Sequence, residues 1–419
     1  MTNETPAATP EHVPGGFLWG ATTAGIKASG NSDLAVAVAT TGTIGAAMFT
    51  SNRVAAAPVT IGRRHLTTTG GRVGAILVNS GNANCATGEQ GIEACISTCV
   101  SAAQAFGCIF DEVIPSSTGI IGVPFPADKI LAAMPALKAS VGPTSEHAAA
   151  FARAIMTTDT RVKMAEASFT VASTDSNPGR TVRIWGAAKG AGMIGPRLDL
   201  PPAPPHATML VYLFTDAAAT PGVLRDALAA AVQPSFNSIS IDGDTSTNDT
   251  VLLLASGASD VTLTRELMSA FDDALADVCF SLARQIVTDG EGVTHVVKLD
   301  IRGAATESDA RLVARAIAHS PLCKTAWSSA DPNWGRLIAA AGYSGAEFDP
   351  NRARIWIGDQ PVFEYGGRAL DFNESAAHTA MSAHEYTITI DLGAGEATTQ
   401  FLTCDLTAEY VRINADYST

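Results

Sequence analysis

Short apolar runs and longer amphipathic stretches alternate along the chain. Residues 73–79 and 251–256 are rich in small and β-branched side chains, which is typical of buried strands. Residues 91–106 and 264–287 place apolar side chains three or four positions apart, as in a helix with one buried face. The alternation predicts an α/β fold, a layered sandwich of sheets flanked by helices.

The clearest helical pattern lies in residues 264–287. Its apolar stripe consists of Leu267, Phe271, Leu275, Val278, Leu282 and Ile286. We expect this stripe to pack against a sheet and to belong to the core.

A strand followed by a helix is predicted near residue 220. Thr220 precedes Pro221, and threonine at the N-cap with proline at the first helical position is a typical helix start. We therefore expect a strand over 209–215 and a helix over 222–232. Residues 195–206 contain five prolines, which exclude a continuous helix and disfavour a central strand. We expect a loop there.

Composition and charge restrict the class of protein. The 419 residues can bury a large core, since 46% are hydrophobic and only 16% are charged. Apolar runs such as 251–255 are far shorter than the roughly 20 residues of a bilayer helix, so we expect no membrane span. A formal charge of −14 argues against a nucleic-acid partner, which would need clustered Lys and Arg. Residues 1–14 predict a loose tail, because they lack the basic start and apolar centre of a signal peptide.

The seven cysteines form no C-x-x-C pair, and their odd number does not suggest a disulfide framework. We expect buried thiols in a reducing cytoplasm. Cys95 and Cys99 lie one helical turn apart, and we expect them to share a packed face with Ile92, Ile96 and Val100 rather than to bind a metal.

Candidate chemistry appears at Ala207 and Thr208, at the start of the apolar run. If the bond between them is cut, Thr208 becomes a new N-terminus whose α-amine lies beside its own hydroxyl. Nucleophile and base then belong to one residue. Local sequence alone favours a plainer interpretation, a loop that leads into a strand.

Several motifs in a fixed order favour the cleavage before Thr208 over the plain loop. They include Lys-Gly-Ala-Gly-Met-Ile at 189–194, Ala-Thr-Met-Leu at 207–210, and the segments 79–84, 117–122, 156–160, 242–250, 289–292, 324–326, 330–336 and 413–419. With these motifs the chain resembles the ornithine acetyltransferase (glutamate N-acetyltransferase) family of self-cleaving enzymes over nearly its whole length.

The resemblance implies cleavage before Thr208 into an alpha chain, 1–207, and a beta chain, 208–419, which stay interlocked in one fold. It implies transfer of acetyl from N-acetylornithine to glutamate through an acyl-Thr208 intermediate, in arginine biosynthesis and without a cofactor. Acetyl-CoA is a further candidate donor, because the family includes enzymes that use it. An alpha2beta2 heterotetramer of the cleaved chains is expected on the same ground.

The resemblance also assigns roles to single residues. Thr118 and Gly119 match the family's oxyanion hole, and Ser-Thr-Gly by itself would be only a turn. Matches to substrate contacts, besides Thr208 itself, are Thr157, Lys189, Glu291, Asn414 and Thr419. An alignment shift would exchange Thr157 for Thr158.

Two further motifs receive structural interpretations. The acidic loop 242–249 does not have the spacing of an EF-hand, so we expect its side chains to cap their own backbone and assign no metal. Residues 330–336 are expected to play a structural role near the site, and a buried contact between Asp331 and Arg336 is conceivable.

The chain departs from the family pattern in a longer, proline-rich segment at 197–206 and in His206, which stands where an apolar residue is common. These departures leave the donor and acceptor open. The alternatives are a related acyltransferase of a secondary-metabolite pathway, an N-terminal-threonine amidase or aminopeptidase, and an uncleaved binding protein for amino-acid derivatives.

Overall fold

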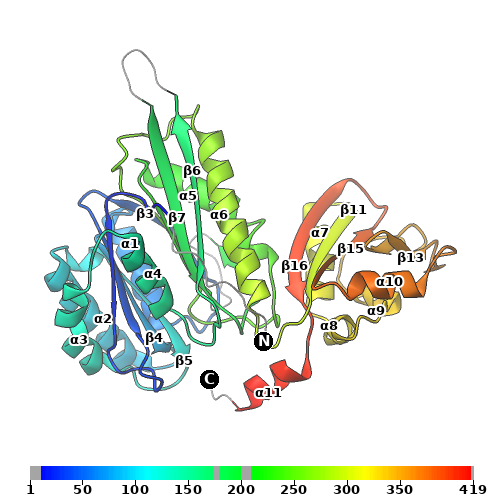
Figure 1. The fold of residues 1–419 in the computed structure, drawn as a ribbon, viewed down its shortest axis with the longest axis horizontal. Helices are drawn as coiled ribbons and strands as arrows, with labels where there is room; N and C mark the ends of the chain where they lie inside the picture. Colours follow the sequence, from blue (N-terminus) through cyan, green and yellow to red (C-terminus); the bar gives the residue numbers. More distant parts are fainter. Residues whose placement is uncertain (1–10, 173–178, 200–208, 417–419) are drawn as a thin grey trace.

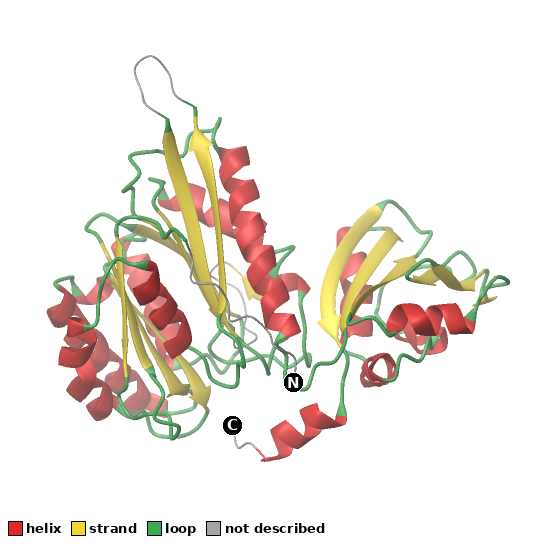
Figure 2. Ribbon diagram, in the orientation of Figure 1, coloured by secondary structure: helices red, strands yellow, loops and turns green. Residues whose placement is uncertain are grey.

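The computed structural model describes residues 11–172, 179–199 and 209–416. Two sheets and their helices form one part of the molecule, and a third sheet with its own helices forms the other (Figure 1, Figure 2). Within the described residues this is a mixed α/β fold of layered sheets, as the sequence pattern predicts.

The first sheet has four strands in the order β1-β2-β4-β5, and only its last pair is parallel. Its strands are β1 (Phe17–Thr22), β2 (Leu34–Ala39), β4 (Ala75–Asn82) and β5 (Val113–Ile120). The helices beside it are α1 (Ala57–Thr69), α2 (Gly88–Phe106), α3 (Ala127–Ala139) and α4 (Ser145–Ala154), with a 3-10 turn at Phe110–Glu112.

The second sheet has six strands in the order β6-β7-β9-β10-β3-β8. They are β3 (Ile44–Thr50), β6 (Lys163–Val171), β7 (Arg180–Lys189), β8 (Leu198–Asp199), β9 (Leu210–Thr215) and β10 (Thr250–Ala255). Helices α5 (Pro221–Val232) and α6 (Met268–Thr288) cover its outer face, and a 3-10 turn spans Phe236–Ser238. Strands from both sides of residue 208 therefore share this sheet.

Aromatic side chains fill the space between the two sheets. Trp19 of β1 meets Trp185 of β7 edge to face at 5.4 Å, and Phe214 of β9 stacks on Trp185 at 5.5 Å. All three are fully buried, so the sheets share one large apolar interface. The result is a helix–sheet–sheet–helix sandwich.

The third sheet follows the order β14-β13-β12-β15-β11-β16. Its strands are β11 (Val296–Ala304), β12 (Arg354–Ile357), β13 (Gln360–Glu364), β14 (Gly367–Arg368), β15 (Glu385–Asp391) and β16 (Ala397–Cys404). The helices are α7 (Glu307–Ala318), α8 (Pro321–Ser328), α9 (Trp334–Gly342) and α10 (Glu374–Met381). The last helix, α11 (Ala408–Asp416), leads the chain back beneath the sandwich (Figure 1).

The principal pattern predictions are confirmed. Phe271, Leu275, Val278, Leu282 and Ile286 are buried in the core beside the second sheet, and Leu267 packs against it. At the start of α5 the side chain of Thr220 accepts a hydrogen bond from the N–H of Val223, and Pro221 is the first helical residue.

Three expectations are wrong in detail. Cys95 and Cys99 are buried, but Ile92 and Val100 are exposed, because the buried face of α2 follows small residues such as Ala102 instead. Leu198–Asp199 forms a short strand at the edge of the sheet, because these two residues lie between Pro196 and the next proline, Pro201, and are themselves free to pair.

The third correction concerns the segment 330–336, which lies in the C-terminal part of the molecule. There Asn333 caps α9, and its side chain also donates to Asp331 at 3.1 Å. Arg336 donates to the carbonyl of Leu322 at 2.8 Å instead of pairing with Asp331.

The seven cysteines are free thiols, and six of them are buried. Among the described helices, none combines the length and apolarity needed to cross a bilayer.

Candidate active site

One pocket collects most of the residues that the sequence singles out. Its volume is about 270 Å³. The lining residues are Thr118, Gly119, Ile121, Thr157, Thr158, Lys189, Gly192, Met193, Asp244, Glu291, Tyr410 and Asn414. They come from both sheets of the sandwich, from the turn after α6 and from α11, so segments far apart in sequence meet here.

The end of β5 supplies Thr118 and Gly119. The backbone of Gly119 has φ +132°, and a Cβ there would lie 2.3 Å from the carbonyl carbon of Gly81 on the neighbouring strand. Only glycine accepts this conformation together with so close a strand. The backbone conformation beside Thr118 therefore depends on this glycine.

Lys189, the last residue of β7, reaches across from the second sheet to the first. Its Nζ donates a hydrogen bond of 3.2 Å to Thr118 Oγ1, and both residues are buried. Since the hydroxyl oxygen accepts from the ammonium, its own proton is free to be donated elsewhere. Thr118 can thus act as a hydrogen-bond donor at the pocket.

Burial lowers the pKa of Lys189, because the ammonium loses its hydration. The negative charges of Asp159, Asp249 and Glu291 act in the opposite direction, whereas the positive charge of Lys163 adds to the lowering. The charge on Lys189 therefore depends on three carboxylates from three different segments.

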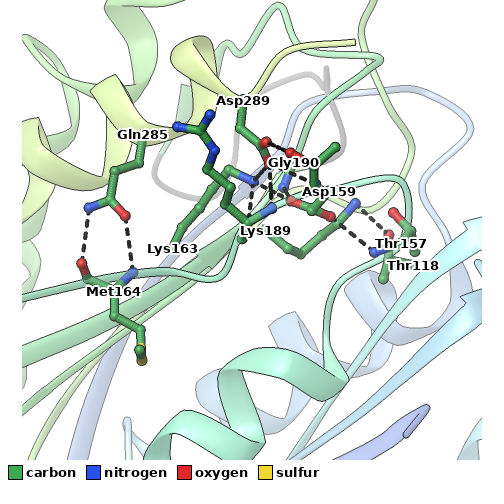
Figure 3. Close-up of polar contacts among 11 residues, drawn as sticks. Thr118, Thr157, Asp159, Lys163, Met164, Lys189, Gly190, Gln285 and Asp289 are labelled. Atoms are coloured by element: carbon green, nitrogen blue, oxygen red, sulfur yellow. Dashed lines mark hydrogen bonds and ion pairs between the residues drawn. The ribbon is translucent and has the colours of Figure 1, made fainter. Parts of the chain in front are cut away.

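A buried ion network lies behind Lys189 (Figure 3). Lys163 Nζ lies 2.7 Å from Asp159 Oδ1 and 2.5 Å from Asp289 Oδ2. The N–H of Gly190 donates to Asp159 Oδ1 at 2.6 Å. Burial alone would raise the pKa of Asp159, but Lys163, Lys189 and the Gly190 N–H together hold it below its ordinary range. Asp159 is therefore a buried anion that fixes the end of β7.

The same carboxylate positions Thr157. The backbone N–H of Thr157 donates to Asp159 Oδ2 at 3.0 Å. Thr157 and Thr158 both line the pocket. Thr160 donates its hydroxyl to Asp289, which joins this turn to the end of α6. Through Asp159, the motif at 156–160 therefore links the start of β6 to the end of β7.

Glu291 and Asn414, which both line the pocket, contact each other. Asn414 Nδ2 donates to Glu291 Oε2 at 2.9 Å, so α11 is held against the turn that follows α6. Gly192 makes room for the carboxylate, since a Cβ there would lie 2.4 Å from Glu291 Oε2. The carboxylate of Glu291 and the ammonium of Lys189 thus line the same pocket.

The acidic loop before β10 caps its own backbone, as expected, and also caps backbone of the segment that follows β7. Asp242 accepts from the N–H groups of Met193 at 2.6 Å, Ile194 at 2.9 Å and Asp244 at 3.0 Å. Tyr410 also donates its hydroxyl to Asp242 at 3.2 Å. Across the described residues, no group of three or more His, Cys, Asp or Glu is arranged to hold a metal ion.

Asp249 is the least satisfied polar group of this region. It is fully buried, and neither carboxylate oxygen has a hydrogen-bond partner among the described residues. Burial raises the pKa of Asp249 well above its ordinary value, against the opposing influence of its own backbone N–H and of Lys189. This carboxyl group therefore keeps its proton to a higher pH than an exposed aspartate does.

Ala207, Thr208 and Thr419 lie outside the described residues. The described chain resumes at Met209, whose carbonyl accepts a hydrogen bond of 2.9 Å from the N–H of Thr250. The next residue, Leu210, is paired with Lys189 on one side and Thr250 on the other.

Comparisons with known proteins place the chain in a family. The model of the ArgJ family matches residues 18–419. The chain belongs to the ArgJ family. The arginine biosynthesis bifunctional protein ArgJ of Thermus thermophilus is 45% identical over 408 residues, which cover 97% of this chain and 99% of that protein.

Two further comparisons accompany this assignment. The protein of the same name from Methylococcus capsulatus is 42% identical over 96% of this ArgJ chain and 95% of its own. A crystal structure of ornithine acetyltransferase from Mycobacterium tuberculosis, complexed with ornithine, is 34% identical and covers 44% of this chain and 94% of that one, with a TM-score of 0.37.

Several residues of this site cannot be recognised as important from the sequence alone. Asp159, Lys163, Asp289 and Asp249 are buried ionisable residues, and a sequence shows no burial for such residues. A signal nevertheless exists, since three of them stand inside or beside the motifs at 156–160, 242–250 and 289–292. Tyr410 carries no comparable signal, because it precedes the last motif.

Proposed function

We propose that this chain cuts itself between Ala207 and Thr208 and then transfers acetyl from N2-acetyl-L-ornithine to L-glutamate in arginine biosynthesis. Two observations support the proposal. Relatives named as arginine biosynthesis bifunctional proteins are 42–45% identical over nearly the whole chain. Thr118, Gly119, Thr157, Lys189, Glu291 and Asn414 all line one pocket.

In the cleavage step, Thr208 Oγ attacks the carbonyl carbon of Ala207. The hydroxyl proton moves to the departing nitrogen of Thr208, and an ester replaces the amide. Water then hydrolyses the ester, which leaves a carboxylate on Ala207 and a free α-amine beside the restored hydroxyl of Thr208. That amine is the candidate base for the second reaction.

The contact between Lys189 and Thr118 carries the mechanistic part of the proposal. Because Thr118 Oγ1 accepts from Lys189, its proton is available to an oxyanion, and we propose the N–H of Gly119 as the second donor. Donors fixed in a buried site stabilise a tetrahedral intermediate without reorganisation at the moment of reaction.

In the transfer step, Thr208 Oγ attacks the acetyl carbon of acetylornithine. Its proton passes through the α-amine to the leaving nitrogen, and ornithine departs from an acetyl-Thr208 ester. The α-amine of glutamate then attacks the ester, N-acetylglutamate leaves, and the hydroxyl recovers its proton. Both half-reactions use the same nucleophile, so ping-pong kinetics follow.

Charges of both signs suit amino-acid substrates. Lys189 would bind a substrate carboxylate and Glu291 a substrate ammonium, since both line the same small pocket. Asn414 holds Glu291 in place, and Thr157 supplies a hydroxyl. Thr208 and Thr419 complete the proposed substrate contacts.

The cleaved chains, 1–207 and 208–419, are proposed to assemble as an alpha2beta2 heterotetramer in the cytoplasm. Acetyl-CoA is proposed as a second donor to be assayed. No other cofactor enters the proposed chemistry.

Intact mass spectrometry of the purified protein tests the cleavage. We expect two masses, with the second chain beginning at Thr208, and a single full-length mass for Thr208→Ala. The matched control, Thr220→Ala, changes a threonine at a helix start and should be cleaved as the wild type is. A wild-type protein that keeps one full-length mass after prolonged incubation would overturn the proposal.

An assay of acetylornithine turnover with and without glutamate tests the transfer. We expect ornithine release to be much faster when glutamate is present and N-acetylglutamate to form in equal amount. Release that proceeds equally well without any amine acceptor would instead identify an amidase.

A further inference from the structure

A second cavity lies where α1, β3 and the beginning of α5 meet. Its volume is about 420 Å³, and it shares no lining residue with the candidate active site. Phe49, Leu66 and Pro221 give it apolar walls, while Arg63 and Arg225 bring two positive charges to it. A cavity of this size can hold a small organic molecule.

The charge of this cavity is unusual for the chain. The net charge of the protein is −14, yet the described residues that line the cavity include no acidic one. Within the described residues, neither Arg63 nor Arg225 forms an ion pair with a carboxylate. Arg63 donates through Nη2 to the carbonyl of Thr50 and lies 5.6 Å from the centre of the Phe49 ring. Two arginines that have no counterion among the described residues thus line the same cavity.

Arg63 also carries an unused donor. Its Nε is buried and has no hydrogen-bond partner among the described residues. A buried donor without an acceptor is costly, and burial lowers the pKa of this guanidinium as well. An oxyanion is the group that would satisfy both the donor and the charge, because the planar guanidinium matches the geometry of a carboxylate or phosphate.

The start of α5 adds to this preference. Pro221, the first helical residue, lines the cavity, and the beginning of a helix carries a partial positive charge. Gly71 also lines the cavity, near Pro221.

We propose that this cavity is an effector site for a small organic anion. The carboxylate or phosphate head binds between Arg63 and Arg225, and a short apolar body packs against Phe49, Leu66 and Pro221. Occupancy alters the acetyl transfer of the candidate active site, and this part of the inference rests on the proposed function.

Thr50 provides the connection between the two sites. Its carbonyl accepts from Arg63, its N–H donates to the carbonyl of Asp249 at 2.6 Å, and its hydroxyl donates to the carbonyl of Ser246 at 2.7 Å. Asp249 in turn acts electrostatically on Lys189. An anion that draws Arg63 toward itself therefore acts on the backbone that carries Asp249.

Isothermal titration calorimetry tests the binding without any need for activity. The probes are butyl phosphate and pentanoate, with pentanamide as the uncharged counterpart. We expect at least one anion to bind and the amide not to bind, and the preferred anion identifies the head group. Arg63→Gln and Arg225→Gln should each weaken binding about tenfold or more. Arg64→Gln, the exposed neighbour on α1 that does not line the cavity, should bind within about twofold of the wild type.

Two additional measurements separate this site from the proposed active site. Lys189→Met should bind the anion as the wild type does, because Lys189 does not line the cavity. Saturating anion should change the kcat or KM of acetyl transfer by at least about twofold in the wild type but not in Arg225→Gln.

Absence of binding by both anions, or undiminished binding by both arginine variants, would overturn the site. Binding through these arginines with unchanged kinetics would overturn its effector role. A protein without acetyl transfer still gives a calorimetric result, so failure of the proposed function remains distinguishable.

Discussion

Lys189 and Thr118 join the two sheets of the sandwich by a buried hydrogen bond of 3.2 Å. The ammonium of Lys189 can donate hydrogen bonds but cannot accept them, so the hydroxyl proton of Thr118 must point away from it. A single contact thus links the cation that is proposed to bind substrate with the donor that is proposed to stabilise the oxyanion.

Removal of the Thr118 hydroxyl tests that donor. We expect Thr118→Ala to lower kcat by about 10² to 10³, which is the usual effect of losing one oxyanion donor. Thr118→Ser keeps the hydroxyl and should retain most of the activity. Steady-state kinetics of both variants provide the measurement, and equal kcat values for Thr118→Ala and the wild type would exclude the role.

The charge of Glu291 can be tested separately from its packing. Glu291→Gln keeps the shape and an acceptor for Asn414 but removes the negative charge. We expect KM for glutamate to rise by about tenfold or more, because an ammonium loses its charged partner. The melting temperature should stay near that of the wild type, and an unchanged KM would contradict the assignment.

The buried network makes Lys163 a structural residue. Lys163→Met leaves Asp159 and Asp289 buried without their shared cation. Breaking a buried pair in this way costs about 3–5 kcal/mol of unfolding free energy. The control is Glu307→Gln, which removes the exposed i,i+4 pair with Arg311 and should cost at most about 1 kcal/mol. Urea denaturation of the two variants gives the comparison.

The raised pKa of Asp249 predicts that the stability of the protein depends on pH. The pKa of this group is raised in the folded protein, so the folded state binds more protons than the unfolded state. The stabilisation from this group is complete below the ordinary pKa of about 3.9 and is lost as pH rises through the folded pKa.

Asp249→Asn removes this titration. We expect the wild type to lose melting temperature relative to the variant as pH increases from about 4 to 8. Asp226→Asn, at an exposed position on α5, is the control and should follow the wild type. Parallel melting curves for the wild type and Asp249→Asn across this range would contradict the prediction.

Gly119 and Gly122 offer a matched pair of glycine substitutions. Gly122 has φ +79° with open space around it, so Gly122→Ala should cost only about 1 kcal/mol from backbone strain. Gly119→Ala adds a Cβ that would overlap the backbone of Gly81, and we expect a much larger loss of stability together with loss of activity. Equal melting temperatures of the two variants would be inconsistent with the packing of β4 against β5.

Much of the fold follows from local patterns. The stripe from Phe271 to Ile286 and the start at Thr220 and Pro221 depend on spacing and capping, which act within one or two helical turns. The order of strands in the sheets does not follow from such patterns, because pairing between distant segments leaves no mark on local spacing. Thr118 and Lys189 are 71 residues apart, and only a family resemblance brings them together in advance.

The residues of the site also fall into those that the sequence predicts and those that it does not. Residues with side chains at the pocket, such as Glu291 and Asn414, were identified from motifs. Asp159 and Lys163 act behind the pocket, and their importance depends on burial and on partners that the sequence does not display. Ile92 and Val100 illustrate the opposite error, since an apolar residue near a buried face is not always on it.

Strand β9, which follows residue 208, is hydrogen-bonded to β7 of the first half of the chain, and β10 is bonded to β3. A cut before Thr208 would therefore break the backbone, but the two fragments would stay bound to each other. Each fragment would leave the other with an incomplete sheet and an uncovered aromatic layer, so neither piece could be withdrawn without unfolding its partner.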